Sequence, residues 1–449
     1  MESTPLCEAL KIALPLVFTT QVNTQLDTGN TDAVINTLQY MRKTNIDDAL
    51  VPKILKIIST KHLTMLTPIQ AKQTLFCVLD WKRSKETAAL VPQLINILLQ
   101  KMDVLDGPEI RAILLKLVKN YETEKDAEIA ANYYNDAFLD ACVGVAVGKD
   151  VGFNCALNIL SNINFFRHSN TPLLDYIAAK CFEKPELLNN ATKYDLKSIL
   201  YGLSLAEYKP VFWETMKDSM MNKNLLDFPL PILTKICVYL MSLDCYWPEL
   251  IEKIFTTFEI KHDDHSSLKT RFTIIHSAVK NDYPQYSGAW PNYEVIEKSA
   301  ISPNLKEEHF EVLKTAVECS LGGPQYIHTN LSTKLGLIID HVAIMRKGGF
   351  PIAINNHGDV KPTKVEDLQP PPDSQVILFY VTPYASCPRN TERLSGVWSL
   401  YIKQLALTTK ATVIPIPKKK WLKFTEAEQI RYISQALRLK CDELSAVVN

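Results

Sequence analysis

TPIQAKQTLFCVLDW at residues 67–81 is followed, after three polar residues, by KETAALVPQLINILLQKM at residues 85–102. Both runs repeat apolar residues at the spacing of an amphipathic helix, which predicts a helical hairpin. Thr67 can cap the first helix, and Pro68 suits its first turn because no partner for an N–H is lost there. A hairpin of this kind cannot cover its own apolar face, so it must stack on another.

The hairpin pattern recurs from Thr31 to about Phe258. Residues 31–60 form an earlier unit, and DGPEIRAILLKLVKN opens another at Asp106. Further units begin near Asp150, Thr192 and Pro229, roughly 40 residues apart, which is a period typical of helical solenoids. We therefore expect a mostly α protein, with an α-solenoid of about six helical-hairpin repeats over residues 1–258 and an irregular helical capping region over residues 259–330.

The sequence pattern changes after residues 322–324 (GGP). β-Branched runs predict strands in residues 334–347, 351–355, 376–381 and 411–417, and helical spacing predicts helices over residues 396–409 and 426–440. A loop is expected over residues 363–374. This order of elements is typical of a small α/β domain, which we place at residues 331–440, with a tail at residues 441–449.

Composition and charge narrow the classes of function. Glycine is scarce, at 14 of 449 residues, and the ten cysteines include no CxxC pair, which is typical of buried thiols in a reducing compartment. No apolar run is long enough for a membrane span. The N-terminus, with Glu2 and Glu8, resembles neither a signal peptide nor a transit peptide. Lys and Arg number 33 against 39 Asp and Glu in residues 1–330, but 16 against 10 in residues 331–449, so we expect a polyanionic partner for the C-terminal part.

The C-terminal part resembles a RAP domain, the RNA-associated module that closes the FAST kinase domain-containing proteins. The resemblance runs through Arg389 to Leu394, Gly396, Lys403 with Leu405, the VIPIP strand at residues 413–417 with Trp421, and Tyr432 with Leu437. It departs from the family at Lys418, Lys419 and Lys420, because many members carry an acidic residue just before the tryptophan. The helical part is similar in order and length to that family's FAST modules, which would lie near residues 155–225 and 259–330.

The resemblance implies a location and a role. Members of this family are mitochondrial matrix proteins that act on mitochondrial transcripts, in their stability or in processing at junctions not marked by transfer RNA. The expected partners are single-stranded mitochondrial mRNA and other RNA-processing proteins. RAP domains resemble the PD-(D/E)XK nuclease fold, so the family also raises the question of RNA cleavage.

Basic and aromatic residues of the C-terminal part form the candidate RNA-binding set, because lysines neutralise phosphates and aromatic faces stack on unpaired bases. Trp398 also lies in this region, but on a helix where burial in the core is the favoured interpretation. The set comprises Arg389, Arg393, Lys403, Lys418, Lys419, Lys420, Trp421, Lys423, Arg431 and Tyr384.

Enzyme chemistry has less support in the sequence. The Gly-rich loop, strand lysine, HRD and DFG motifs of protein kinases are missing, and we expect no cofactor. Asp340 is the single candidate catalytic residue for a metal-dependent RNA endonuclease, and the neighbouring strand VILFYVTP supplies neither an acid nor a lysine. HDDH at residues 262–265 has the spacing of a metal pair but lies in a polar loop, so no metal site is expected. A protein-binding helical scaffold remains a further alternative.

Overall fold

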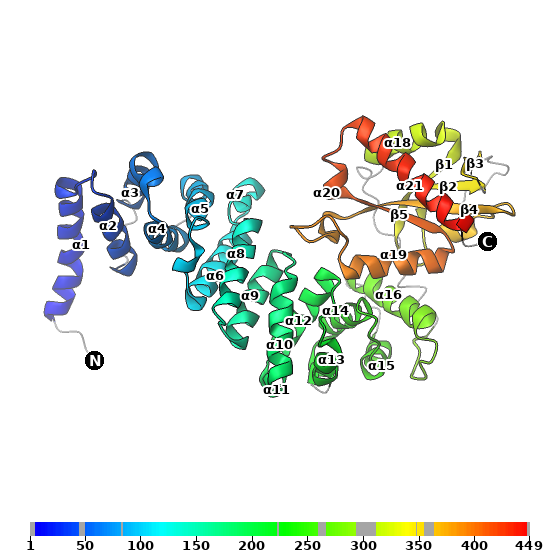
Figure 1. Ribbon diagram of the computed structural model, residues 1–449, viewed down its shortest axis with the longest axis horizontal. Coiled ribbons are helices and arrows are strands. Elements are labelled where there is room, and N and C mark those ends of the chain that lie inside the picture. The colour runs from blue at the N-terminus through cyan, green and yellow to red at the C-terminus, as the bar shows by residue number, and fades with distance from the viewer. Residues whose placement is uncertain are drawn as a thin grey trace. The chain divides into compact units, whose positions relative to one another are not determined.

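The structure is a computed structural model that describes residues 5–44, 50–81, 84–221, 224–258, 266–292, 311–346, 348–353 and 363–446. The protein is mostly helical, with a small mixed sheet of five strands in its C-terminal part (Figure 1). The chain divides into two compact units, residues 1–180 and residues 181–449. The domain boundaries expected at residues 258, 330 and 440 stay predictions. In the part of the chain that the structure describes, no helix has the length and apolar character needed to cross a bilayer.

The first unit consists of helices. They are α1 (Pro5–Gln25), α2 (Thr31–Thr44), α3 (Leu50–Ile57), α4 (Pro68–Asp80), α5 (Lys85–Leu98), α6 (Gly107–Thr123), α7 (Ala127–Ala131), α8 (Asp136–Gly148), α9 (Phe153–Phe165) and α10 (Thr171–Glu183), which continues into the second unit. The helices predicted at residues 67–81 and 85–102 are observed, although the second ends at Leu98, and α4 and α5 pack together as a hairpin.

Helix starts follow the signals that the sequence carries. Thr67 accepts a hydrogen bond from the N–H of Gln70, whose side chain accepts one from the N–H of Thr67. Asp106 and Glu109 form the same reciprocal pair at the start of α6. These capping boxes satisfy N–H groups that have no partner inside the helix. The predicted starts at Thr67 and Asp106 are therefore confirmed.

Successive hairpins of the first unit contact each other at equivalent positions. Helix α2 packs on α4, α4 on α6, and α6 on α9. Asp80 at the end of α4 forms ion pairs with Arg42 of α2, at 2.5 Å, and with Lys116 of α6. Each partner lies about one hairpin away in sequence, so the repeat period is visible in the contacts.

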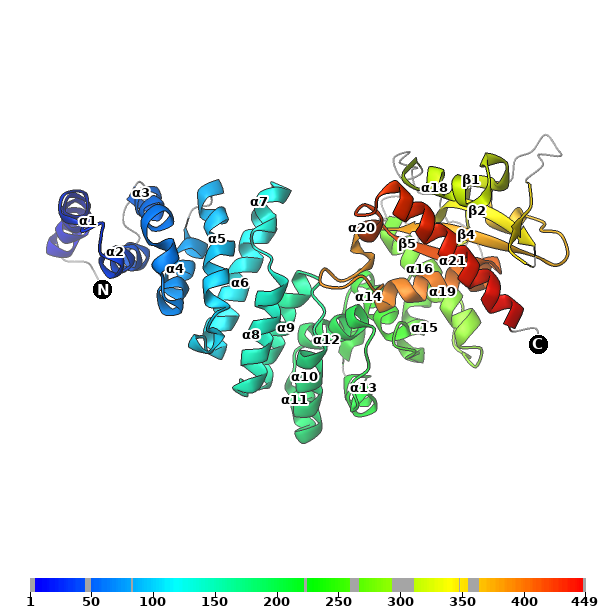
Figure 2. The same ribbon diagram turned by 45° about the horizontal axis from the view of Figure 1, so that its top comes forward.

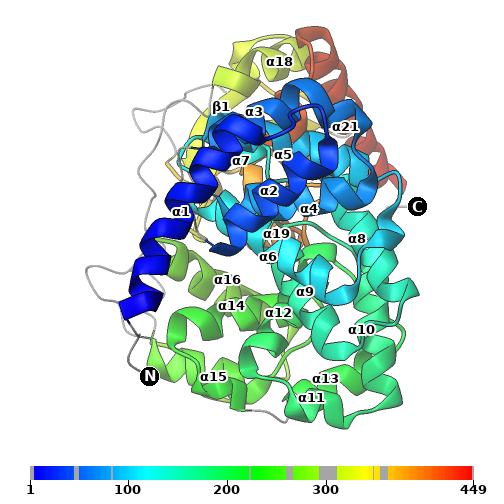
Figure 3. The same ribbon diagram turned by 90° about the vertical axis from the view of Figure 1, so that its left-hand side faces the viewer.

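The second unit contains a further set of stacked helices. They are α11 (Glu186–Asn190), α12 (Lys193–Ala206), α13 (Trp213–Met221), α14 (Leu230–Met241), α15 (Pro248–Thr257) and α16 (Ser266–Asp282). Thr192 caps α12 through a capping box with Asp195. Helix α12 packs on α14, and α14 on α16, so that the three lie side by side (Figure 3).

The sheet belongs to this second unit. Its strands are β1 (Ile327–Ser332), β2 (Ile338–Arg346), β3 (Phe350–Pro351), β4 (Ser374–Thr382) and β5 (Thr412–Pro417), in the order β1-β2-β4-β5 with β3 paired to β2. The contacts of β2 with β1, β3 and β4 are antiparallel, whereas β4 and β5 are parallel, with Leu378 opposite Val413. A parallel pair needs a crossover connection, and α19 (Gly396–Thr409) supplies it.

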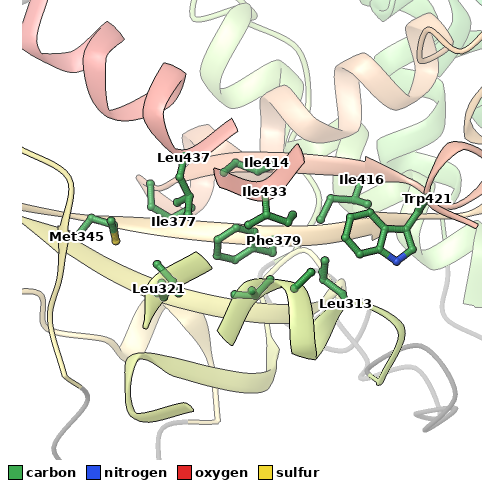
Figure 4. Packing of buried hydrophobic residues seen from close by; sticks show 13 residues of the cluster. Leu313, Leu321, Met345, Ile377, Phe379, Ile414, Ile416, Trp421, Ile433 and Leu437 are labelled. Atoms are coloured by element: carbon green, nitrogen blue, oxygen red, sulfur yellow. The ribbon is translucent and has the colours of Figure 1, made fainter. Parts of the chain in front are cut away.

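Helices cover both faces of the sheet. Helices α18 (Glu311–Leu321) and α21 (Glu426–Ala446) pack together on one face (Figure 2). Their core with the strands includes Val317, Phe379, Ile416, Ile433 and Trp421, which are almost completely buried (Figure 4). Side chains alternate along a strand, so Leu378 and Tyr380 point to the opposite face, which is that of α19.

Helix α19 lies between the sheet and the stacked helices, and a polar network joins it to α16. The buried side chain of Gln404 donates to Asp282, at 2.6 Å, and accepts from Asn281 and Ser277, at 2.9 and 3.1 Å. Thr408 is 3.0 Å from Ser277. The C-terminal sheet and the stacked helices therefore form one packed body through α19.

Candidate nucleic-acid interface

The carboxyl ends of β4 and β5 bring two basic segments together. Because these strands are parallel and adjacent, the loop after Thr382 and the short helix α20 (Lys418–Trp421) after Pro417 emerge at the same edge of the sheet. Lys419 Nζ donates a hydrogen bond to the backbone oxygen of Arg389, which ties the two segments. Arg389 and Lys419 thus lie at one site, although they are 30 residues apart in sequence.

We name this site the basic edge and define it by six cations and one carboxylate. The carboxylate of Glu392 lies 3.3 Å from Lys420 Nζ and 3.9 Å from Lys423 Nζ. Ion pairs of such exposed groups stabilise by only about 0–1 kcal/mol, so both lysines can turn to another anion at little cost. The basic edge comprises Arg389, Arg393, Lys418, Lys419, Lys420 and Lys423, with Glu392.

The two aromatic residues of the predicted RNA-binding set, Trp421 and Tyr384, differ in their exposure. Trp421 is only 1% exposed and is part of the core between the sheet and α21, as Figure 4 shows. A buried ring offers no face to a base, so its prediction as an RNA contact is wrong. Lys420 Nζ lies 5.9 Å from the centroids of the Phe424 and Tyr432 rings. Tyr384, in the loop after β4, is 54% exposed and is the aromatic side chain best placed for a ligand.

Two predicted contacts lie outside the basic edge. Lys403 is on α19, where its Nζ is 2.9 Å from the carboxylate of Asp282 and its side chain is 49% exposed. Arg431 is exposed on α21, next in sequence to Tyr432. The structure therefore brings six of the eight predicted cations together and places Lys403 at a different site.

Asp340, the candidate catalytic residue, lies on β2 and is 4% exposed. Its Oδ2 accepts a hydrogen bond of 2.7 Å from the N–H of Val381, beyond the last β2–β4 register pair, His341 and Phe379. The side chain thus substitutes for a backbone acceptor where the ladder ends. Burial raises the pKa of Asp340 to about 7.

In the described part of the chain, Asp340 has no cluster of metal-ligand side chains around it. Within the described ranges, no group of three or more His, Cys, Asp or Glu side chains could hold a metal ion. The HDDH sequence at residues 262–265 lies outside the described residues.

A second polar site was not found from the sequence. A pocket of about 490 Å³ lies among α13, the turn before α15, the end of α16 and α19. Its lining residues come from four separate segments, so only Lys403 had been singled out. They are Lys217, Met221, Asp244, Cys245, Tyr246, Asp282, Tyr283, Gln285 and Lys403.

The spacing of tyrosines at the repeat period is the sequence signal that could have indicated this pocket. Tyr246 follows α14 and Tyr283 follows α16, at almost one repeat period, and the stacking of these helices brings the two rings parallel with centroids 5.3 Å apart. Tyr201 and Tyr239 also contact each other across α12 and α14, with centroids 5.4 Å apart and the rings tilted by 56°. Aromatic residues at the period of the repeat thus predict ring contacts between neighbouring hairpins.

Comparison of the chain with models of known protein families gives no match, and comparison with curated proteins gives none either. The assignment of a function therefore depends on the residues and their geometry, together with the motif resemblance described above.

Proposed function

We propose that this protein binds single-stranded RNA, and that the basic edge is where it contacts the phosphates. The observation that carries the proposal is the convergence, at the ends of two parallel strands, of two segments that together carry six cations and Glu392. Cations that neutralise phosphates release condensed counterions, and this release drives the binding of nucleic acids. Tyr384, exposed in the same loop, adds a ring on which an unpaired base can stack.

The stacked helices extend this proposal. The rows α2-α4-α6-α9 and α12-α14-α16 are consistent with an α-solenoid within each unit, and solenoids use extended surfaces to hold long ligands. The resemblance to FAST kinase domain-containing proteins with a RAP domain, itself resembling the PD-(D/E)XK nuclease fold, supplies the rest of the proposal. The RNA would be mitochondrial mRNA in the matrix, and the protein would act on its stability or processing, beside other RNA-processing proteins.

Salt dependence tests the role of the basic edge. We expect the Lys418→Gln/Lys420→Gln variant to bind a single-stranded oligoribonucleotide more weakly. Each lost phosphate contact should flatten the slope of log K against log salt by about 0.7, so the double variant should flatten it by about 1.4. Fluorescence anisotropy over a range of KCl concentrations measures both quantities.

A matched control removes two cations from the opposite edge of the sheet. Arg346 ends β2, opposite the first residue of β4, and Lys410 precedes β5. The Arg346→Gln/Lys410→Gln variant has the same net charge as the test variant and should keep the wild-type slope. Equal slopes for the two double variants would reject the basic edge, and no binding by the wild-type protein would reject the proposed function.

A further inference from the structure

We infer that the pocket between α13, α16 and α19 takes one unstacked nucleotide of the bound RNA, with its base against the Tyr246–Tyr283 pair. This inference rests on the proposed function and deepens it by assigning a site for the base, separate from the basic edge. The pocket lies within the second unit, and its elements can be followed in Figure 1.

The size and lining of the pocket favour a polar ligand that has a flat aromatic face. A volume of about 490 Å³ is within the usual range for small-molecule sites, roughly 300–1,000 Å³, and is ample for one nucleotide. Tyr246 and Tyr283 are half-buried, and their rings are within 14° of parallel. Single-stranded nucleic acids are held through such rings because every base has a π face.

Asp282 holds one wall of the pocket in place. Its carboxylate accepts hydrogen bonds from Gln404, at 2.6 Å, and from the hydroxyl of Tyr246, at 3.2 Å, and it pairs with Lys403, at 2.9 Å. Burial, followed by the charge of Asp282, raises the pKa of Tyr246, so its hydroxyl stays protonated and donates. Two side chains of α19 and one of the turn before α15 are thereby fixed around the space before any ligand arrives.

Two ammonium groups can meet the phosphate of the nucleotide. Lys403 comes from α19 and Lys217 from α13, where Lys217 pairs with the exposed carboxylate of Glu214. An ammonium group has three donors, and each of these pairs uses only part of them. At the pocket's rim, Asp244 and Gln285 are exposed and offer acceptors, and Gln285 also offers donors, to the polar edge of a base.

This arrangement differs in kind from that of the basic edge. The basic edge is rich in cations and suits a chain of phosphates, whereas the pocket balances Lys217 and Lys403 against Asp244 and Asp282. Because Lys217 and Lys403 already pair with Glu214 and Asp282, the pocket should contribute mainly stacking and hydrogen bonds, and less to the salt slope than the basic edge does.

The experiment compares the Tyr283→Ala and Tyr283→Phe variants of the full chain in binding a ten-residue oligouridylate. Loss of the ring should weaken binding about tenfold and change the salt slope less than the Lys418→Gln/Lys420→Gln variant does, and Tyr283→Phe should bind within about twofold of wild type. Tyr194→Ala is the matched control, because this tyrosine is 61% exposed on α12 outside the pocket. It should bind like wild type.

Crosslinking of the unaltered protein keeps the test independent of variant folding. Irradiation with an oligonucleotide that contains 5-iodouridine should give crosslinked peptides that include Tyr246 or Tyr283. Crosslinks confined to other segments, or wild-type affinity of a folded Tyr283→Ala variant, would overturn the pocket and leave the basic edge standing. If the wild-type protein binds no RNA, both proposals are wrong.

Discussion

Asp340 has a carboxyl group that the sheet removes from water while giving one of its oxygens a backbone N–H. An unfolded aspartate has a pKa of about 3.9, whereas burial raises the pKa of Asp340 to about 7 in the folded protein. Between these values the folded state holds a proton that the unfolded state has lost. The free energy of unfolding therefore falls as the pH rises from about 4 to about 7, and this contribution is constant above that window.

The Asp340→Asn variant removes this dependence, because its amide keeps an oxygen acceptor for Val381 and cannot ionise. Relative to wild type, we expect it to gain stability by about 2 kcal/mol between pH 5 and pH 7.5, as measured by urea unfolding. Asp340→Leu should destabilise at every pH, since it leaves the Val381 N–H without its acceptor. A difference between wild type and Asp340→Asn that does not vary with pH would contradict the raised pKa.

The charges of the basic edge were more predictable from the sequence than the burial of the aromatic residues beside it. Lys418 to Lys420 follow a strand that ends in Pro417, so a basic turn could be expected there from the sequence. The burial of Trp421 could not, because it depends on α18 and α21 covering the same face of the sheet. The residue type is equally compatible with a core and with a stacking platform.

At the scale of elements, α19 was predicted over residues 396–409, as observed, whereas β1 was missed. Helix α19 has an apolar face with the period of a helix, and its start and end agree with the sequence. β1 reads IHTNLS and has one fully buried residue, Leu331. It is an edge strand that is identified by its pairing with β2, and that pairing is a long-range property.

The start of α19 contacts α12 so closely that it tolerates only glycine. A Cβ on Gly396 would lie 2.8 Å from the backbone oxygen of Ser204 and 3.2 Å from Ser242 Oγ. We expect Gly396→Ala to lower the free energy of unfolding by about 1–3 kcal/mol, because a backbone atom must move. Denaturant unfolding measures the change.

Gly144, in the middle of α8, gives the contrast. No heavy atom lies within 4 Å of its hypothetical Cβ, so Gly144→Ala should leave stability unchanged or raise it by up to about 1 kcal/mol. Equal effects of the two substitutions would show that the close contact between α19 and α12 does not affect the free energy of unfolding.

At the scale of the whole molecule, the hydrophobic period predicted the hairpins, and the β-branched runs after residue 324 predicted a mixed α/β C-terminal part. The division at residue 180 could not be predicted, because it lies inside α10, where the helical pattern is continuous. Nor does the sequence indicate that α12, α14 and α16 share a unit with the sheet. That union depends on α19, whose contacts span more than 100 residues of sequence.

The packing of α19 makes a prediction about fragments. Residues 331–449 lack α18, whose Leu313 and Val317 are completely buried in the sheet's core, and expose the face of α19 that packs on α16. We expect this fragment to unfold without a cooperative transition, and residues 181–449 to unfold cooperatively, as followed by circular dichroism. A cooperative transition for residues 331–449 would instead support a domain boundary near residue 330.

The contact between α19 and α16 also determines which helices can pack at this place in the fold. Gln404 and Ser277 are buried there, and Asn281 donates to Gln404; these hydrogen bonds require particular directions, which apolar contacts do not. An equally apolar helix without an amide at the position of Gln404 would leave these polar groups buried without hydrogen-bond partners. The polar network therefore favours the packing of α19 on α16 over the packing of either helix on an apolar helix that lacks these groups.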